Sequence, residues 1–277
     1  MTIRPIFVFG RHRSGTTWLS NVIASSPEVF APSHELHRGI HESAFFSHLV
    51  RFCNGGRTAA DLLAIKELFE RSDFFLLTGL AEGPDIVRHG FAGYFRLVME
   101  AAARKSGARY WLEKTPAHTL LAKYLSESYP DAILLAMIRD SRAVVASNVH
   151  GFGNPRSPWA WFRQAAVTAI YEKIVVRNRV HVIRYEDLRD HHRGTVRSIA
   201  ERLGLAVDSL SLDAFDRNSS YPGEAPSFEW WQIAAMACGR GLVRMTPGRL
   251  IELAVDRWRR RKAAVLPDWY FLIGSRR

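Results

Sequence analysis

Short apolar runs, each bounded by polar or turn-forming residues, mark the candidate strands of this chain. The runs at 3–9, 131–140 and 180–188 are rich in Val, Ile, Leu and Phe, and the first of them ends at Gly10. Runs of this length and composition are typical of buried β-strands. A shorter run at 28–32 indicates one further strand.

Longer segments with apolar residues at helical spacing separate these runs. Helices are predicted at 16–26, 58–105, 115–130, 141–151, 159–178 and 194–204. The helix at 115–130 has clear end signals, because Thr115 can cap it, Pro116 suits its first turn and Pro130 follows its end. Strands that alternate with helices form βαβ units. The sequence therefore predicts an α/β fold with a central parallel β-sheet flanked by helices.

The predicted elements form a single domain at 1–240, and a basic helical C-terminal appendage at 241–277 packs on this domain or extends from it. The chain has 277 residues, and its 47% hydrophobic content is enough for a sizeable core. Its apolar runs are shorter than the roughly 18 residues of a membrane helix, and the N-terminal run is too short for a signal peptide. Cys53 and Cys238 match no metal-binding spacing and are expected to be free thiols. A cytoplasmic location is therefore expected.

The formal net charge of +11 makes the chain basic. A basic protein attracts anions such as nucleotides, nucleic acid, acidic glycans or anionic lipid, and charge alone does not choose among them. The segment 241–277 is both basic and amphipathic, a pattern typical of helices that lie on an anionic membrane surface. This segment has two possible roles: it contacts the inner face of the membrane, or it packs on the domain.

The stretch FVFGRHRSGTTWLS, residues 7–20, joins the first predicted strand to the first helix through a glycine-containing turn. Backbone N–H groups at such a turn, with the positive end of the helix, form a cradle for phosphate. The spacing is close to that of a Walker A loop, but Thr16 stands where such a loop has lysine. Two classes of protein remain. A P-loop kinase or NTPase would need Asp140 to hold Mg²⁺ beside the positive Arg139, whereas the other class neutralises a nucleotide phosphate with arginine and lysine and no metal.

Four motifs in one order resemble those of the sulfotransferases that use 3′-phosphoadenosine 5′-phosphosulfate (PAPS). RSGTTWL at 13–19 resembles their 5′-phosphosulfate loop, and LLAMIRDSRAVVAS at 134–147 resembles their 3′-phosphate motif. LEKTPAHT at 112–119 resembles the lysine-bearing segment of Golgi-type and bacterial members, and IRYEDL at 183–188 resembles the strand with a tyrosine near the adenine. The resemblance covers most of residues 6–190. It implies a P-loop NTPase-like sulfotransferase fold, with PAPS as donor, 3′,5′-adenosine bisphosphate (PAP) as product and no metal.

The resemblance also implies which residues bind the donor. They are Arg13, Ser14, Gly15, Thr16, Thr17, Trp18, Arg139, Ser147, Tyr185 and Ser219. Arg139 closes a predicted buried strand and is expected to bind the dianionic 3′-phosphate through two parallel hydrogen bonds. Ser147 lies about two turns along the next helix. Arg142 and Arg217 are candidates to complete this 3′-phosphate clamp.

Sulfuryl transfer builds negative charge on the oxygen that bridges to the departing 5′-phosphate, so preorganised cations are needed there. Arg13 and Lys114 are the predicted catalytic cations. The acceptor hydroxyl also needs a base. The segment SHELHRGIHES at 33–43 offers His34, Glu35, His37, His41 and Glu42. Glu35 is the first candidate, because the Golgi-type relatives have a catalytic glutamate in a similar region, and His37 and His34 are the next alternatives.

The segments at 40–105 and 152–178 connect the cofactor motifs and are expected to shape the acceptor pocket. The acceptor is expected to be a glycan, a glycolipid, a tyrosine or other phenol, or another small molecule, and no nucleic acid partner is expected. Glu113 is expected to be the structural partner of an arginine. The alternatives to a sulfotransferase are a P-loop kinase or NTPase and a non-enzymatic basic nucleotide-binding protein.

Overall fold

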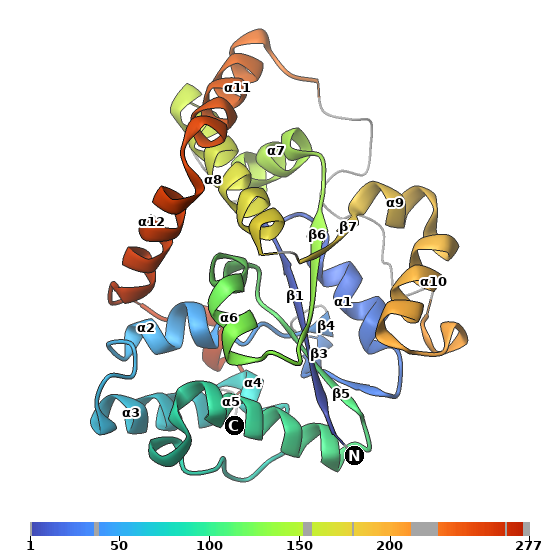
Figure 1. Cartoon of the computed structure of the whole chain (residues 1–277), viewed down its shortest axis with the longest axis vertical. Helices are drawn as coiled ribbons and strands as arrows, with labels where there is room; N and C mark the ends of the chain where they lie inside the picture. Colours follow the sequence, from blue (N-terminus) through green and yellow to red (C-terminus); the bar gives the residue numbers. More distant parts are fainter. Residues whose placement is uncertain are drawn as a thin grey trace.

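A central parallel sheet organises the chain. The computed structural model describes residues 2–35, 39–151, 157–178, 180–211, 227–263 and 265–273. Five strands lie in the order β2-β5-β1-β6-β7, and every neighbouring pair is parallel. These strands are β1 (Arg4–Gly10), β2 (Val29–Phe30), β5 (Tyr110–Lys114), β6 (Ile133–Ile138) and β7 (His181–Arg184). Helices surround the sheet (Figure 1), so the predicted α/β fold class is confirmed.

The helices follow the strands in the alternating order that the sequence predicts. They are α1 (Thr16–Ala24), α2 (Val50–Phe52), α3 (Ala59–Glu70), α4 (Asp73–Leu76), α5 (Ile86–Lys105), α6 (Ala122–Ser128), α7 (Ser141–Gly151), α8 (Pro158–Arg177), α9 (Tyr185–Asp190), α10 (His192–Leu203), α11 (Trp230–Met245) and α12 (Gly248–Arg260). Shorter elements are the hairpin strands β3 (Ser33–His34) and β4 (Gly39–Ile40), the π-helix η2 (Phe45–Leu49), and the 3₁₀ helices η3 (Pro116–Leu121), η4 (Val207–Ser209) and η5 (Asp268–Phe271).

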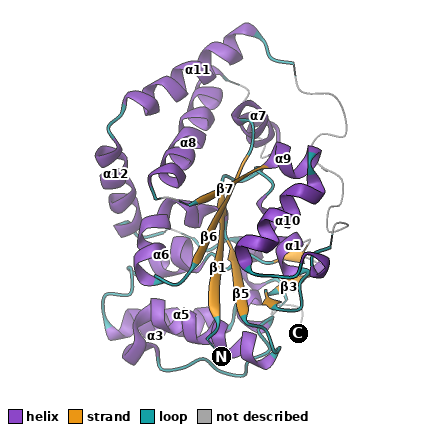
Figure 2. Ribbon diagram, turned by 45° about the vertical axis from the view of Figure 1, so that its right-hand side comes forward, coloured by secondary structure: helices purple, strands orange, loops and turns teal. Residues whose placement is uncertain are grey.

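The alternation of side chains along β1 explains why both faces of the sheet are covered. Ile6 and Val8 point into one core, which they share with α1 and α10, whereas Phe7 and Phe9 point into the other, which they share with η2, α5 and α8. Figure 2 shows α1 and α10 on one side of the strands and α5 and α6 on the other. All four side chains are fully buried, and each contributes about 2 kcal/mol through burial. The central strand is thus fixed by two separate cores.

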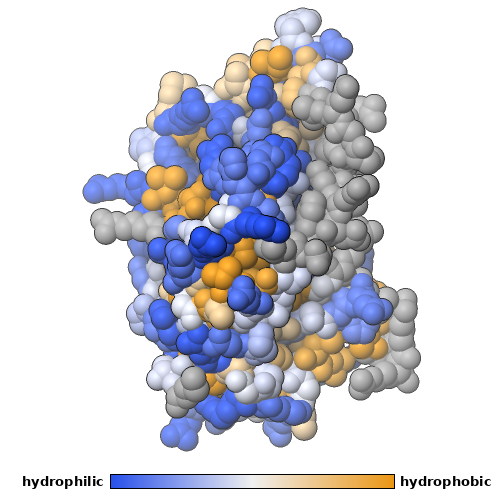
Figure 3. Space-filling view, turned by 90° about the vertical axis from the view of Figure 1, so that its right-hand side faces the viewer, coloured by the Kyte–Doolittle hydropathy of each residue, from blue (hydrophilic) through white to orange (hydrophobic). Residues whose placement is uncertain are grey.

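Helix α10 has the amphipathic pattern of a surface helix. Its buried residues Val196, Ile199, Ala200 and Leu203 recur at helical spacing and pack on the core that contains Ile6. Figure 3 views the side of the molecule that carries α9 and α10, and hydrophilic side chains dominate the drawn surface there.

The order of the strands places the loops of interest at one edge. Strand β1 lies between β5 and β6, so the chain runs to one side of β1 first and crosses to the other side afterwards. In open α/β sheets, ligands bind beyond the carboxyl ends of the strands at such a switch point. The segments that follow β1, β5, β6 and β7 meet at this edge, and they carry the motifs singled out in the sequence.

Three elements differ from the sequence prediction. Strand β5 was not predicted, because Glu113 and Lys114 end it and charged residues are unusual in a buried strand. The predicted helix at 115–130 is divided into the 3₁₀ helix η3 and the helix α6, and the Thr119 side chain donates to Pro116 O within this 3₁₀ turn. The predicted strand at 180–188 ends at Arg184, and α9 begins at Tyr185.

The C-terminal helices extend along one side of the molecule (Figure 1). Helix α11 packs along α8, and Lys173 on α8 donates to the carbonyl oxygens of Val243 and Thr246. Ile251 and Tyr270 belong to the same buried core as Phe7. The domain boundary at residue 240 and the membrane contact of the tail stay predictions. Over the described ranges, the helices are too short or too polar to cross a bilayer.

Candidate active site

The loop after β1 needs glycine at two positions. Gly10 and Gly15 have φ angles of +146° and +91°, which side chains rarely adopt. A Cβ atom at Gly10 would lie 2.6 Å from Met137 O, and one at Gly15 would lie 2.6 Å from the ring of Tyr185. The loop therefore approaches both β6 and the segment after β7 closely. Arg13 also has a positive φ of +73°, a strained angle that is often associated with function.

The first turn of α1 leaves its backbone N–H groups open to an anion. Gly15 is the N-cap residue, and within the described chain no side chain caps this end. Ser14 and Thr16 are buried, whereas Thr17 is partly buried. Uncapped N–H groups and the helix dipole favour a negative charge at such an end. The residues that the sequence assigned to phosphate binding thus lie together around one cradle.

Two arginines lie beside this cradle. Arg13 Nε donates to Ser147 Oγ at 2.8 Å, and Arg139 Nη1 donates to Arg13 O at 3.3 Å. The phosphate loop, the end of β6 and helix α7 therefore meet here. Three of the predicted donor-binding residues form one connected group, although they are distant in sequence.

The charge of Arg139 is not compensated by a carboxylate in the described structure. The carboxylates of Asp140 and Glu186 have other partners: Asp140 pairs with Arg142 at 3.2 Å, and Glu186 accepts the backbone N–H of Asp140. The same pairing occupies Arg142, a candidate for the 3′-phosphate clamp. The guanidinium of Arg139 lies 4.3 Å from the centroid of the Tyr185 ring, so Tyr185 positions it.

Tyr185 lies in a packed aromatic group, and only 5% of its surface is exposed. Its ring centroid lies 5.5 Å from that of Trp18 in an edge arrangement, and Trp18 stacks in turn on His192 at 5.6 Å. Gly15 and Arg139 contact the same tyrosine ring. The described contacts of Tyr185 therefore hold the loop and the arginine in place.

Lys114 forms the other half of the site. It is the last residue of β5, only 3% of its side chain is exposed, and its Nζ donates to Glu42 Oε1 at 2.9 Å. Glu42 is 22% exposed. A buried lysine of this kind needs a partner charge, and Glu42 supplies it.

A buried hydrogen-bond network fixes the backbone next to Glu42. The Glu113 carboxylate accepts from Ser43 Oγ at 2.7 Å and from Thr115 Oγ1 at 2.6 Å, and it contacts His118 Nδ1 at 2.9 Å. Burial alone would raise the pKa of Glu113, but these contacts outweigh it and lower the pKa. The expectation that Glu113 pairs with an arginine was wrong, since the basic side chain that contacts it is that of His118.

The same network holds a strained residue. Ala44 has a φ of +46°, and its N–H donates to Thr115 Oγ1 at 3.1 Å. The π-helix η2 starts directly after it. Short π-helical turns occur frequently at functional sites. The strained backbone is therefore tied to β5, and it sets the position of the preceding Glu42 against Lys114.

Two histidines lie beside this pair. Desolvation lowers the pKa of His12, and the neighbouring Arg11 and Lys114 lower it further, although Glu42 acts in the opposite direction. Desolvation also lowers the pKa of His48 to about 4, with a further contribution from His118. His48 Nδ1 lies 2.9 Å from Ser47 Oγ. His48 is therefore neutral at pH 7.

The predicted base is exposed, whereas Lys114 is almost fully buried. Glu35 is exposed and follows β3, in the turn of the small hairpin. Asn21 on α1 anchors the hairpin by accepting the N–H of Ile40 at 3.3 Å. His34 is half-buried at the end of β3. The predicted residues His37, Arg217 and Ser219 lie outside the described residues.

Sequence reasoning missed two contributors and did not favour a third. Thr119 Oγ1 accepts the N–H of Gly10 at 2.8 Å, and Asn148 donates to His12 O at 3.0 Å, so both brace the phosphate loop. Glu42 is the third. Thr119 and Asn148 lie in or beside motifs that the sequence reading had identified, and this proximity was the available signal. Glu42 lies in the segment that offers the candidate bases, but the sequence did not favour it over Glu35, because its partner Lys114 is 72 residues away.

The fold and the site define an α/β protein in which a glycine-containing loop at a helix start is flanked by cations from several strand ends. Residues 5–209 match the sequence model of the sulfotransferase family. Because this match spans well over half of the chain, the chain belongs to the sulfotransferase family.

Solved structures give a weaker similarity. The sulfotransferase domain of an olefin synthase from Synechococcus PCC 7002 is 17% identical with a TM-score of 0.47, and the alignment covers 96% of this chain and 97% of that one. A sulfotransferase from Alicyclobacillus acidocaldarius is 16% identical with a TM-score of 0.48, covering 94% and 100%. No curated protein matches the chain. We base the family assignment on the sequence match, because both TM-scores lie below 0.5.

Proposed function

We propose that this chain transfers a sulfuryl group from PAPS to a hydroxyl of an acceptor molecule. The observation that carries the proposal is the contact of Arg13 with Ser147 and of Arg139 with Arg13. These contacts join the phosphate loop to the segment that resembles the 3′-phosphate motif. A nucleotide with phosphates at both the 5′ and the 3′ positions would engage both.

The residues at the loop suit such a donor. The open N–H groups at the start of α1 are donors for the oxygens of the 5′-phosphosulfate. Arg139 has no carboxylate partner among the residues described, and its guanidinium suits bidentate binding of a 3′-phosphate, with Ser147 close by. We assign Ser14, Thr16, Thr17, Trp18 and Tyr185 to the same donor site, and Ser219 stays a prediction.

The proposed reaction forms a bond between the acceptor oxygen and sulfur while the bond from sulfur to the 5′-phosphate oxygen breaks. Negative charge then grows on the departing oxygen, and fixed cations stabilise it best where water is excluded. Lys114 and Arg13 are the proposed cations. Lys114 is well suited, because it is almost fully buried at the carboxyl edge of the sheet.

The acceptor proton must pass to a base. Of Glu35 and Glu42, the geometry favours Glu42, which is held at Lys114 and is only partly exposed. Glu35, the candidate from sequence, is exposed in the hairpin turn and stays a prediction. A glutamate that lies beside the cation can accept the proton where the charge develops.

Calorimetric titration tests the proposed donor. We expect PAP to bind without added metal and in the presence of a chelator, and 5′-AMP to bind at least tenfold more weakly because it lacks the 3′-phosphate. A P-loop kinase or NTPase would instead bind ATP in a Mg²⁺-dependent manner, and a polynucleotide-binding protein would show a steep loss of affinity with salt. Equal affinity for PAP and 5′-AMP would refute the proposed donor site.

The acceptor class stays open among glycans, glycolipids, phenols and other small molecules. A screen with sulfate-labelled donor and extracts of these classes would identify it. A labelled product that depends on both the donor and Lys114 would mark a true acceptor.

A further inference from the structure

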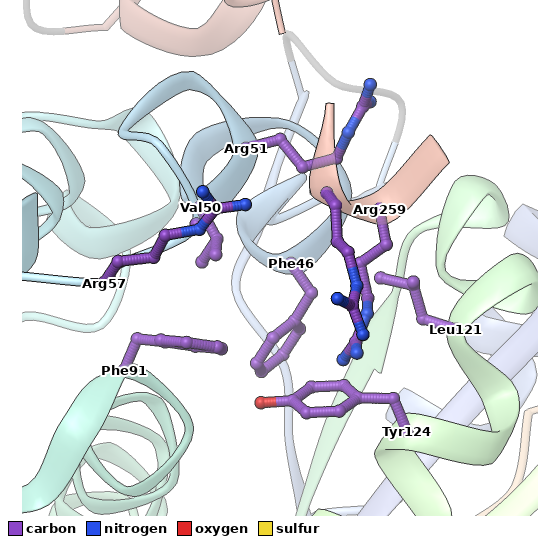
Figure 4. A pocket seen from close by; sticks show the side chains of 10 residues that line it. Phe46, Val50, Arg51, Arg57, Phe91, Leu121, Tyr124 and Arg259 are labelled. Atoms are coloured by element: carbon purple, nitrogen blue, oxygen red, sulfur yellow. The ribbon is translucent and has the colours of Figure 1, made fainter. Parts of the chain in front are cut away.

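A hollow lies away from the phosphate loop, between the segment η2–α2, helices α5 and α6, and the end of α12. Its volume is about 170 Å³. Figure 4 shows side chains from these elements converging on one space. An engineered cavity of about 150 Å³ accepts benzene, so this hollow is large enough for one aromatic ring.

Three aromatic rings form the floor of this hollow. Phe46, Phe91 and Tyr124 come from different elements, and their ring centroids lie 6.2 to 6.4 Å apart in a closed triangle. Their rings face one another in Figure 4. Aromatic pairs at such distances attract one another, and a further flat ring can pack against them in the same way.

The rim of the hollow is positively charged. Its charged residues in the described structure are all arginines, namely Arg51, Arg57, Arg259 and Arg260. Arg259 lies over the Tyr124 ring at 4.9 Å from its centroid. In Figure 4, Arg57 reaches toward the hollow from the side opposite Arg259.

Two of these arginines already have partners, and two do not. Arg51 donates to Ser47 O at 3.1 Å and to Trp258 O at 3.0 Å, and it stacks on the Trp258 ring. The guanidinium groups of Arg57 and Arg260 form no hydrogen bond or ion pair with the described residues. Like charges around one hollow repel each other, and a bound anion would relieve that repulsion.

We propose that this hollow binds a small aromatic molecule that carries a negatively charged group. The ring would pack on Phe46, Phe91 and Tyr124, and the anionic group would contact Arg57 and Arg260. This proposal is independent of the proposed sulfuryl transfer.

The hollow nevertheless shares a wall with the transfer site. The Phe46 ring lies 5.3 Å from that of His118, which contacts Glu113, the neighbour of Lys114. Phe46 belongs to η2. His48 of the same π-helix is close enough to Glu42 and His12 for both to affect its pKa. A ligand on the aromatic floor would therefore touch the same π-helix that borders Lys114 and Glu42.

Titration calorimetry with phenyl phosphate tests the proposal. We expect phenyl phosphate to bind. Phenol, which lacks the anionic group, and inorganic phosphate, which lacks the ring, should each bind at least tenfold more weakly. The double variant Arg57→Ala/Arg260→Ala should weaken phenyl phosphate binding at least tenfold. Both side chains are exposed, so the fold should persist, as circular dichroism would verify.

Two single variants locate the binding. Arg257→Ala removes an exposed arginine of α12 outside the hollow, and Arg139→Ala removes the arginine of the phosphate loop region. Both should leave phenyl phosphate affinity within about twofold of the parent protein. An unchanged affinity in the double variant, or an equal loss in either single variant, would overturn the proposal.

Discussion

The two halves of the candidate active site differ in whether a carboxylate neutralises their positive charge. On the nucleotide side, Arg139 contacts a carbonyl oxygen and the ring of Tyr185, and it has no carboxylate partner among the described residues. On the acceptor side, Lys114 is buried and already neutralised by Glu42. A charge without a carboxylate partner is ready to bind an anion, whereas a compensated charge acts only when the charges around it change.

This contrast assigns different tasks to the two halves. The nucleotide side should determine how tightly the donor binds in the ground state. The lysine side should matter most when negative charge develops during transfer, because interactions that strengthen only in the transition state raise kcat. Variants of Lys114, Glu42 and Arg139 test this division, and a variant of His48 tests how its buried setting affects stability.

Lys114→Ala should have the largest effect. We expect kcat to fall about 1,000-fold, or about 4 kcal/mol, while the Kd for PAP changes less than about threefold. Single-turnover kinetics and calorimetry measure the two quantities separately. Lys123→Ala, an exposed lysine on α6, is the matched control and should be fully active. A large loss of PAP affinity in Lys114→Ala would place this lysine on the nucleotide side.

Glu42→Gln should reduce kcat about 100-fold, because it removes the proposed base and the counter-charge of Lys114 together. Glu35→Gln should reduce it less than about threefold, since Glu35 is exposed in the hairpin. Assays of kcat with saturating donor compare the two variants directly. The opposite result would restore Glu35 as the base and would require the hairpin to move toward Lys114.

Arg139→Ala should weaken PAP binding about 30-fold, or about 2 kcal/mol, and should leave 5′-AMP binding almost unchanged. The effect is specific to the nucleotide with a 3′-phosphate. Arg142→Ala, which removes a surface arginine paired with Asp140, is the control and should alter PAP binding less than about twofold. Equal losses for PAP and 5′-AMP would contradict the assignment of Arg139 to the 3′-phosphate.

His48→Gln should change how stability depends on pH. The pKa of His48 is about 4 in the folded chain and about 6.5 when unfolded, so below pH 6.5 the unfolded chain binds a proton that folded His48 does not. The folded chain should lose about 1 to 2 kcal/mol between pH 7 and pH 5 through this group. Urea unfolding at several pH values should show a smaller loss in the variant. An identical slope in both proteins would show that His48 stays easily protonated after folding.

The phosphate loop and its arginines could be predicted from sequence because their chemistry is local. Gly10, Gly15 and Thr16 lie within one short loop region, and Arg139 directly follows an apolar strand. Lys114 was identified through a motif, although its strand was not. Strand β5 was not predicted, because charged residues such as Glu113 and Lys114 usually lie on the surface. Their partners in the fold are distant in sequence.

The position of the base could not be predicted for the same reason. Glu42 reaches Lys114 only because Ser43, Ala44 and Thr115 tie its segment to β5. Neither the strained backbone of Ala44 nor the π-helix after it follows from residue type or hydrophobic spacing. A long-range pairing of this kind emerges only in the folded sheet.

The arrangement of the sheet also makes ligand binding a measure of complete folding. The proposed donor contacts come from segments after β1, β6 and β7, and β5 carries the proposed catalytic lysine. A fragment that lacks any of these strands lacks part of the site. A nucleotide that binds only the intact sheet, at about a hundred times its Kd, adds about 2.7 kcal/mol to the free energy of unfolding. A rise in melting temperature with PAP would therefore show that the nucleotide binds the assembled sheet in preference to the unfolded chain.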